Sequence, residues 1–182
     1  ICVNNEIFFW ECKYYIDRLV VPMGYETDVI AIREAESIFA AYQAGMESTD
    51  AKYKVYMHQD VFIRNQNFLS DMITLFQKDD SLGLIGMMGA STMPKTGVAY
   101  LAWDVGLIDA RDADMAYMLS GDTDKKQNTY VEAVDGLLFV TQQDVPWRED
   151  LFSDFDFYDV SECFELRRKG YQIMVPYMKT PW

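Results

Sequence analysis

The feature that most constrains the fold is an alternation of strand-like and helix-like patterns in the first half of the chain. Short apolar segments rich in β-branched residues occur at 1–3, 27–32 and 53–57, and two segments with helical spacing separate them. Strands and helices that alternate with short loops form parallel sheets with right-handed crossovers. We therefore expect an α/β, Rossmann-like fold with a mostly parallel central sheet and helices on both faces.

The second half of the chain has a mixed pattern. A helix at 65–76 and a strand at 82–88 are expected first. Residues 91–124 are rich in Gly, Met and Asp, and we expect a loop-rich insertion with one hairpin there. The remaining patterns indicate a helix and three more strands, at residues 159–169, 129–134, 137–141 and 172–176.

The charge balance limits the partners of the protein. The 182 residues carry a formal net charge of −13, and half of them are apolar. Polymeric nucleic acid needs a basic surface, so this partner is excluded, and an anionic membrane surface is disfavoured. A small phosphate ligand would need a divalent cation to compensate its charge.

Cysteine use and hydropathy exclude two further classes. The three cysteines, Cys2, Cys12 and Cys163, have no CxxC spacing, so neither a zinc site nor a disulfide framework is expected. No apolar run approaches 18 residues, and we expect no transmembrane segment in this chain.

The triplet His58-Gln59-Asp60 is the first candidate site. It directly follows the strand expected at 53–57 and contains the only histidine of the chain. In open α/β sheets, ligands bind beyond the carboxyl ends of the strands. These three side chains could hold a metal ion or a sugar phosphate there.

Five segments in a fixed order carry a family resemblance. They read ICVNNE, AAYQAG, YKVYMHQDVFI, VDGLLFVT and FDFYDVSECFELRRKGYQIMVP. Together they make the chain similar to glycosyltransferase family 2-like proteins of GT-A fold, in particular a small bacterial subgroup with a His-Gln-Asp motif. The resemblance spans nearly the whole chain. It implies one catalytic domain over residues 1–182, with a nucleotide-binding half at 1–90 and an acceptor and catalytic half at 91–182.

The resemblance implies a metal site at the triplet. In the family, a DxD-type motif holds a divalent metal on the donor diphosphate. Asp60 matches its last aspartate, and His58 stands in place of the first one. The implied ion is Mn²⁺ or Mg²⁺, because both bind oxygen ligands that the phosphates and water also supply, and Mn²⁺ accepts imidazole more readily.

The resemblance also implies a catalytic base near the end of the chain. The family has an acidic Glu-Asp pair there, followed by a helix and a glycine. Counting back from Gly170, Asp159 matches the aspartate that deprotonates the acceptor hydroxyl, and Tyr158 replaces the glutamate. The metal at Asp60 and the base at Asp159 are therefore expected to flank the sugar.

Donor-binding residues are implied by position. The end of the first strand, the end of the second strand and the second helix contact the nucleotide in the family. Asp135 and Gly136 match a segment that lines the donor sugar, where a glycine lets a ligand approach the backbone. The expected donor-binding residues are Asn4, Asn5, Glu6, Arg33, Tyr42, Gln59, Asp135 and Gly136.

Each of these residues also has a structural interpretation. Asp60 could cap a turn or helix, and His58 could be a hydrogen-bonded structural residue. Asp159 could be a helix N-cap in a capping box with Glu162, and Asp135-Gly136 could be a hairpin turn. The patterns leave these alternatives open.

The implied function is a glycosyltransferase. It would move a hexose or N-acetylhexosamine from a nucleoside diphosphate, with UDP favoured, to a glycan or lipid-linked hydroxyl, with inversion. The implied setting is bacterial surface polysaccharide synthesis in the cytoplasm or at the inner face of the membrane. The main alternative is a non-catalytic nucleotide-sugar-binding or scaffold domain of the same fold. A sugar nucleotidyltransferase would need a Gly-rich, basic phosphate loop, and Asn4-Asn5-Glu6 is neither.

Overall fold

The computed structural model describes residues 1–98, 102–112, 115–120 and 126–182 of the chain. These residues form four helices and three sheets. The α/β class is therefore confirmed.

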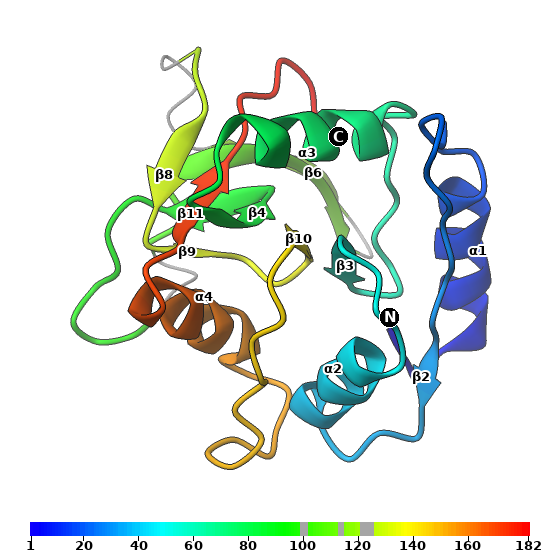
Figure 1. Cartoon of the computed structure of the whole chain (residues 1–182), viewed down its shortest axis with the longest axis horizontal. Helices are drawn as coiled ribbons and strands as arrows, with labels where there is room; N and C mark the ends of the chain where they lie inside the picture. Colours follow the sequence, from blue (N-terminus) through cyan, green and yellow to red (C-terminus); the bar gives the residue numbers. More distant parts are fainter. Residues whose placement is uncertain (99–101, 113–114, 121–125) are drawn as a thin grey trace.

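A five-stranded sheet in the order β3-β10-β4-β11-β8 lies at the centre of the molecule (Figure 1). The expected mostly parallel pairing is wrong in detail, because among the described strands of this sheet only β11 and β4 pair in parallel. β10 is antiparallel to both β3 and β4, and β8 is antiparallel to β11. Local patterns cannot reveal this, since β10 comes from late in the chain and inserts between two early strands. The strands are β3 (Lys54–Met57), β4 (Leu82–Gly86), β8 (Thr129–Val131), β10 (Leu138–Thr141) and β11 (Gln172–Val175).

Helices cover both faces of this sheet, as expected. α3 (Phe68–Lys78) lies on one face, and α2 (Ile38–Glu47) and α4 (Tyr158–Arg168) lie on the other (Figure 1). In α3, Phe68, Met72 and Phe76 are buried at a spacing of four residues, so one stripe of the helix faces the core.

A separate pair of strands lies beyond the β3 edge, next to α1 (Glu6–Ile16). β1 (Cys2–Val3) and β2 (Ile32–Arg33) pair in parallel. The strand expected at 27–32 is therefore wrong over most of its length, because regular pairing begins only at Ile32. Glu34, directly after β2, is a non-glycine residue in the left-handed region with φ 56°.

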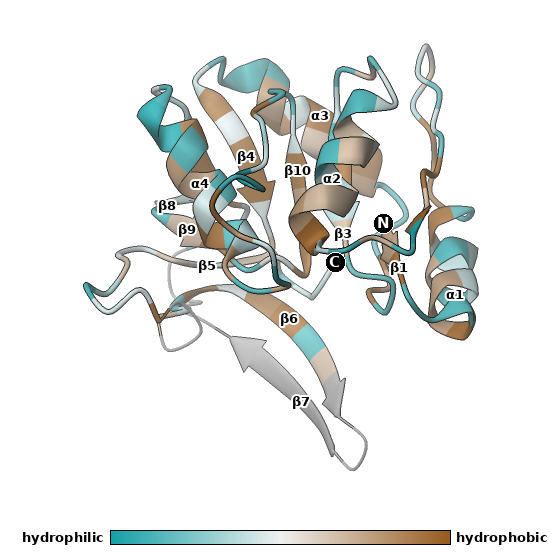
Figure 2. Cartoon of the chain, turned by 90° about the horizontal axis from the view of Figure 1, so that it is seen from below, coloured by the Kyte–Doolittle hydropathy of each residue, from teal (hydrophilic) through white to brown (hydrophobic). Residues whose placement is uncertain are grey.

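A second sheet is built at the carboxyl end of β4, in the antiparallel order β7-β6-β5-β9. The hairpin of β6 and β7 is the one expected within residues 91–124, and parts of that insertion lie outside the described residues. Figure 2 shows β6 lying away from α2, α3 and α4. The strands are β5 (Met88–Ala90), β6 (Val105–Asp112), β7 (Met115–Ser120) and β9 (Ala133–Val134).

The strand predicted at 129–134 divides between the two sheets. β8 and β9 are separated by Glu132, whose N–H donates to the Ala90 carbonyl at 2.8 Å. The chain thereby crosses from the central sheet to the second one. This crossing carries the segment after β9 to the carboxyl end of β3.

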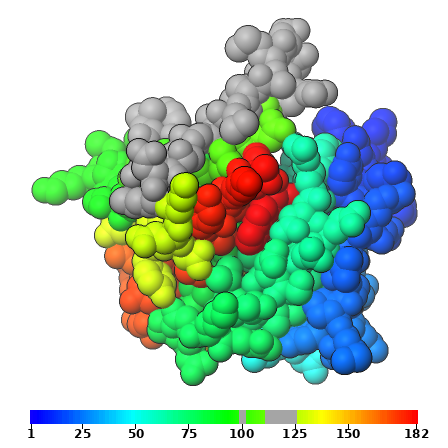
Figure 3. Space-filling model, turned by 90° about the horizontal axis from the view of Figure 1, so that it is seen from above, coloured from blue at the N-terminus to red at the C-terminus, as the bar shows by residue number. Residues whose placement is uncertain are grey.

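The end of the described chain packs against the segment that follows β3. The Trp182 carbonyl accepts hydrogen bonds from the amides of Arg64 and Asn65, and the Tyr177 amide donates to the Asn128 side chain. Figure 3 shows this segment, in red, seated between the two regions it contacts. None of the helices in the described residues has the length and apolar character needed to cross a membrane.

Candidate active site

Segments that are distant in the sequence meet at the carboxyl end of β3. Leu138, the first residue of β10, pairs with Met57, the last residue of β3. The His58 amide donates to the Leu137 carbonyl at 3.0 Å. The turn at 135–136 therefore lies beside the histidine-containing triplet.

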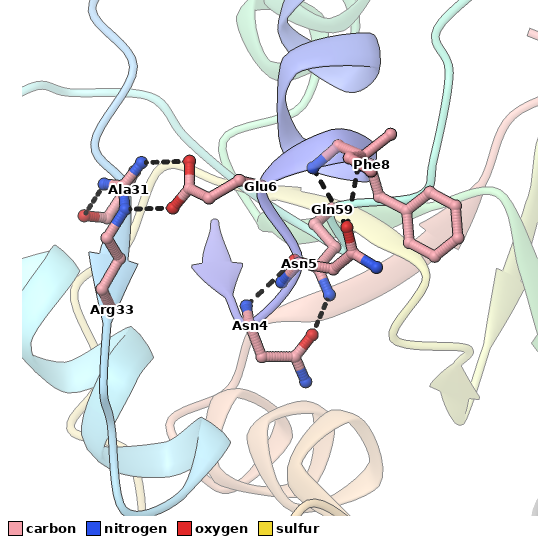
Figure 4. A network of polar contacts seen from close by, with 8 residues as sticks. Asn4, Asn5, Glu6, Phe8, Ala31, Arg33 and Gln59 are labelled. Carbon is pink, nitrogen blue, oxygen red and sulfur yellow. Dashed lines mark hydrogen bonds and ion pairs between the residues drawn. The ribbon is translucent and has the colours of Figure 1, made fainter.

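The side chain of Gln59 connects the ends of β3 and β1. Its Oε1 accepts from the Asn4 amide at 3.0 Å and from the Asn5 amide at 2.9 Å, and its Nε2 donates to Asn4 Oδ1 (Figure 4). Asn5 is also the N-cap of α1, since its Oδ1 accepts from the amides of Ile7 and Phe8. The structure thus brings these three predicted residues together, with their hydrogen bonds directed mainly at one another.

Glu6 and Arg33 form an exposed ion pair at the rim of this region (Figure 4). The guanidinium nitrogens Nε and Nη2 lie 2.6 and 3.1 Å from the two carboxylate oxygens, a bidentate geometry. The hydrogen bond from Arg33 lowers the pKa of the Glu6 carboxyl. Arg33, which was predicted to contact the donor, is therefore already paired with the Glu6 carboxylate.

Asp159 lies in the first turn of α4 and faces the 135–136 turn. Its Oδ2 accepts from the Gly136 amide at 2.9 Å, and its Oδ1 accepts from the Val160 amide at 2.8 Å. Burial raises the pKa of the Asp159 carboxyl to about 6, and the nearby Asp135 carboxylate adds to the rise. A carboxylate with this pKa can accept a proton at neutral pH.

The His58 ring is hydrogen-bonded to the first residue of α4. Its Nε2 contacts the Tyr158 hydroxyl. Burial lowers the pKa of His58, although the carboxylates of Asp60 and Asp135 act in the opposite direction. Burial therefore favours the neutral imidazole, and its Nε2 accepts the hydroxyl proton when the ring proton lies on Nδ1.

Asp60 is exposed, and no hydrogen bond to its carboxylate is found within the described residues. The same part of the chain holds no group of three or more His, Cys, Asp or Glu side chains that could bind a metal ion. An exposed carboxylate fits a cation that takes its other ligands from phosphates and water. His58 fits less well in this arrangement, because Tyr158 contacts its Nε2.

Tyr42 lies in the core rather than on the surface of this region. Its side chain is 2% exposed and packs against Tyr56, Trp147 and Tyr158. Its hydroxyl has no hydrogen-bond partner within the described residues. Donor contact by Tyr42 stays a prediction, and the structure gives its ring a packing role behind Tyr158.

A mostly apolar cavity of about 410 Å³ lies along β3. Its walls come from α2, β3, α3 and the segment before β2. Among the predicted site residues, all of which the structure describes, only Tyr42 lines it. Its size therefore does not make it the site of the chemistry, because Asp60, Asp135 and Asp159 do not line it.

Tyr158 is the residue of this region that was not assigned a role from the sequence. In the sequence it stands only as the replacement for the family's glutamate before Asp159. Its position directly before the predicted base was the available signal. The contact with His58 is not visible in the sequence, because the two residues are 100 positions apart.

Two comparisons with known proteins bear on this arrangement. A family model described as "Glycosyltransferase like family" matches residues 1–182. A search of curated proteins finds no match.

Proposed function

The chain belongs to the glycosyltransferase-like family, and we propose that it transfers a sugar from a nucleoside-diphosphate donor to a hydroxyl group of an acceptor. The donor site would lie at the carboxyl ends of β1 and β3, where ligands bind in sheets of this kind. UDP-hexose or UDP-N-acetylhexosamine is the donor that we favour, with a glycan or a lipid-linked sugar as the acceptor.

The observation that carries this proposal is the placement of Asp159. Its carboxylate is held by the Gly136 amide beside the segment that follows β3, and its pKa is raised to about 6. We propose that it takes the proton of the acceptor hydroxyl as that oxygen attacks the anomeric carbon. The bond to the diphosphate breaks on the opposite face, the nucleoside diphosphate leaves with the electron pair, and the configuration inverts.

Local charge supports assistance by a divalent cation. Asp60, Asp135 and Asp159 lie near one another, as their effects on His58 and Tyr158 indicate, and Arg33 is paired with Glu6. A diphosphate would meet uncompensated negative charge there. Mn²⁺ or Mg²⁺, when bound, would neutralise the charge of the diphosphate and stabilise it as the leaving group. Asp60 is the residue that we expect to hold the ion.

The proposed setting is bacterial surface polysaccharide or glycoconjugate synthesis. A location in the cytoplasm or at the inner face of the membrane is part of this proposal.

Two substitutions test the assignment of roles. We expect Asp159→Asn to lower kcat by about 100-fold or more, while donor binding measured by calorimetry with UDP and Mn²⁺ changes less than about twofold, because the base acts only in the chemical step. Asp60→Asn should abolish the gain in UDP affinity that Mn²⁺ provides.

The matched control is Asp156→Asn, an exposed aspartate in the same acidic segment. It should leave both measurements unchanged. The proposal would be refuted if none of the UDP, GDP and CDP compounds bound at millimolar concentration. Full turnover by Asp159→Asn would place the base elsewhere.

A further inference from the structure

We propose that Tyr158 is a positioning residue, which holds Asp159 and the 135–137 turn against the end of β3 through its contacts with His58 and Gly136. This inference rests on the proposed function for its catalytic consequence. Its structural part can be measured without any substrate.

The first contact is the hydrogen bond between the Tyr158 hydroxyl and His58 Nε2. The Tyr158 side chain is buried, and that of His58 is half-buried. A neutral pair in which the phenol donates and the imidazole accepts satisfies both groups. The proton of His58 then lies on Nδ1.

The second contact explains the glycine at position 136. A Cβ atom added there would lie 2.1 Å from the Tyr158 hydroxyl oxygen and 2.3 Å from Cζ. The backbone of Gly136 does not have a positive φ, so the position needs a small residue rather than a flexible one. A ligand was predicted to approach this backbone closely; within the protein, the group that approaches it closely is the Tyr158 side chain.

The contacts form a closed ring of interactions around the candidate base. The Gly136 amide donates to Asp159, which follows Tyr158 in α4. The Leu137 carbonyl accepts from the His58 amide at 3.0 Å, and the His58 ring returns to Tyr158. Removing the hydroxyl of Tyr158 therefore opens the ring at one point and leaves its other bonds in place.

The backbone before α4 directs Tyr158 into this ring. Phe157 is the N-cap residue, it has φ 63° in the left-handed region, and it makes no side-chain capping hydrogen bond. Such a conformation is costly for a bulky residue and persists where surrounding contacts determine it. The burial of Tyr158 against Phe39 and Tyr42 supplies such contacts.

The test uses Tyr158→Phe, which keeps the ring and its packing and removes only the hydroxyl. Because His58 is the only histidine, its imidazole nitrogens are unambiguous in NMR spectra of ¹⁵N-labelled protein. In the wild type we expect a neutral ring protonated at Nδ1. In Tyr158→Phe, the Nε2 resonance should shift, and the Gly136 amide should exchange with solvent about fivefold faster or more.

The control is Tyr130→Phe, at a tyrosine on β8 whose hydroxyl donates to Asp79 at 2.5 Å. It also removes one phenolic hydrogen bond to a side chain, and it should leave His58 and Gly136 unchanged. Gly136→Ala is the second variant, because its Cβ must displace Tyr158, and it should shift His58 in the same way. An Nε2 resonance or a Gly136 exchange rate that is the same in Tyr158→Phe and wild type overturns the proposal.

Kinetics test the catalytic consequence. With a donor that the wild type uses, Tyr158→Phe should lower kcat by about 10-fold or more and change the donor KM less than about twofold, since misplaced bases slow the chemical step. The effects of His58→Gln and Tyr158→Phe should be non-additive, because both remove the same hydrogen bond. An unchanged kcat would overturn the positioning role. Absence of transfer by the wild type would count against the proposed function alone, because the NMR result stands without substrate.

Discussion

At the scale of single residues, Asp159 combines two opposing influences. Burial disfavours its charged form, whereas the amides of Val160 and Gly136 stabilise the carboxylate. The balance leaves the pKa at about 6 rather than at the ordinary value of 3.8. The residue is therefore deprotonated at neutral pH and is more basic than an exposed aspartate.

This balance predicts the pH dependence of activity. Asp159, the proposed general base, must be deprotonated to act, so kcat/KM should rise with pH through about 6 and reach a plateau above pH 7. Initial rates at saturating Mn²⁺ between pH 4.5 and 8 measure this profile. A limb centred near pH 4, as expected for an exposed aspartate, would contradict the assignment.

At the scale of elements, α1 shows how a helix start is tied to the end of β3, where the donor is proposed to bind. Asn5 caps the helix with its side chain, and its own amide is bound by Gln59 from the end of β3. The N-cap of α3, Asn67, makes no side-chain capping bond. The two asparagines occupy the same helical position with different contacts.

This difference predicts different costs of substitution. Asn5→Ala should lower the free energy of unfolding by about 1 kcal/mol, because two α1 amides lose their acceptor. Asn67→Ala is the matched change and should stay within about 0.5 kcal/mol of the wild type. Urea unfolding followed by circular dichroism measures both. Equal losses for the two variants would mean that the cap of α1 contributes nothing specific.

The elements also show where sequence patterns stop being informative. The helical spacing of Phe68, Met72 and Phe76 predicted α3, because burial of one helix face repeats along the sequence. The division of residues 129–134 between two sheets was not predictable. Both pieces are short strands. Which sheet each one joins depends on the neighbouring strands, β11 for β8 and β5 for β9, and these lie far away in the sequence.

At the scale of the whole molecule, the net negative charge and the buried acidic side chains both make the folded state less stable as pH rises. The net charge is −13, and Glu162 is 3% exposed on the inner side of α4. Burial raises the pKa of Glu162 to about 8, from an ordinary value of 4.5. The folded protein therefore holds a proton on Glu162 at pH values where the unfolded chain has released it.

This predicts that stability falls as pH rises. Between the unfolded pKa of 4.5 and the folded pKa of about 8, the folded state binds more protons, so the free energy of unfolding decreases with pH. For one such group the slope approaches about 1.4 kcal/mol per pH unit. Asp159 acts in the same direction over a narrower window that ends near pH 6.

Thermal melts at pH 5 and pH 8 should therefore show the higher Tm at pH 5. Glu162→Gln should flatten the dependence between pH 5 and 8, because the group that titrates is gone. The exposed Glu149→Gln is the control and should leave the slope as in the wild type. A stability maximum at pH 8 for the wild type would contradict the buried, protonated state of Glu162.

Taken alone, the sequence determined the α/β class and the approximate positions of the four described helices and of β3, β4, β10 and β11. It also indicated Asp60 and Asp159 as the pair to test. These features depend on the local spacing of apolar residues and on the order of motifs, both of which are visible in the sequence itself. The tertiary structure decided the strand pairing, the burial of Tyr42 and the contact between His58 and Tyr158. Each of these depends on segments distant in sequence, whose proximity is set by packing of the whole chain.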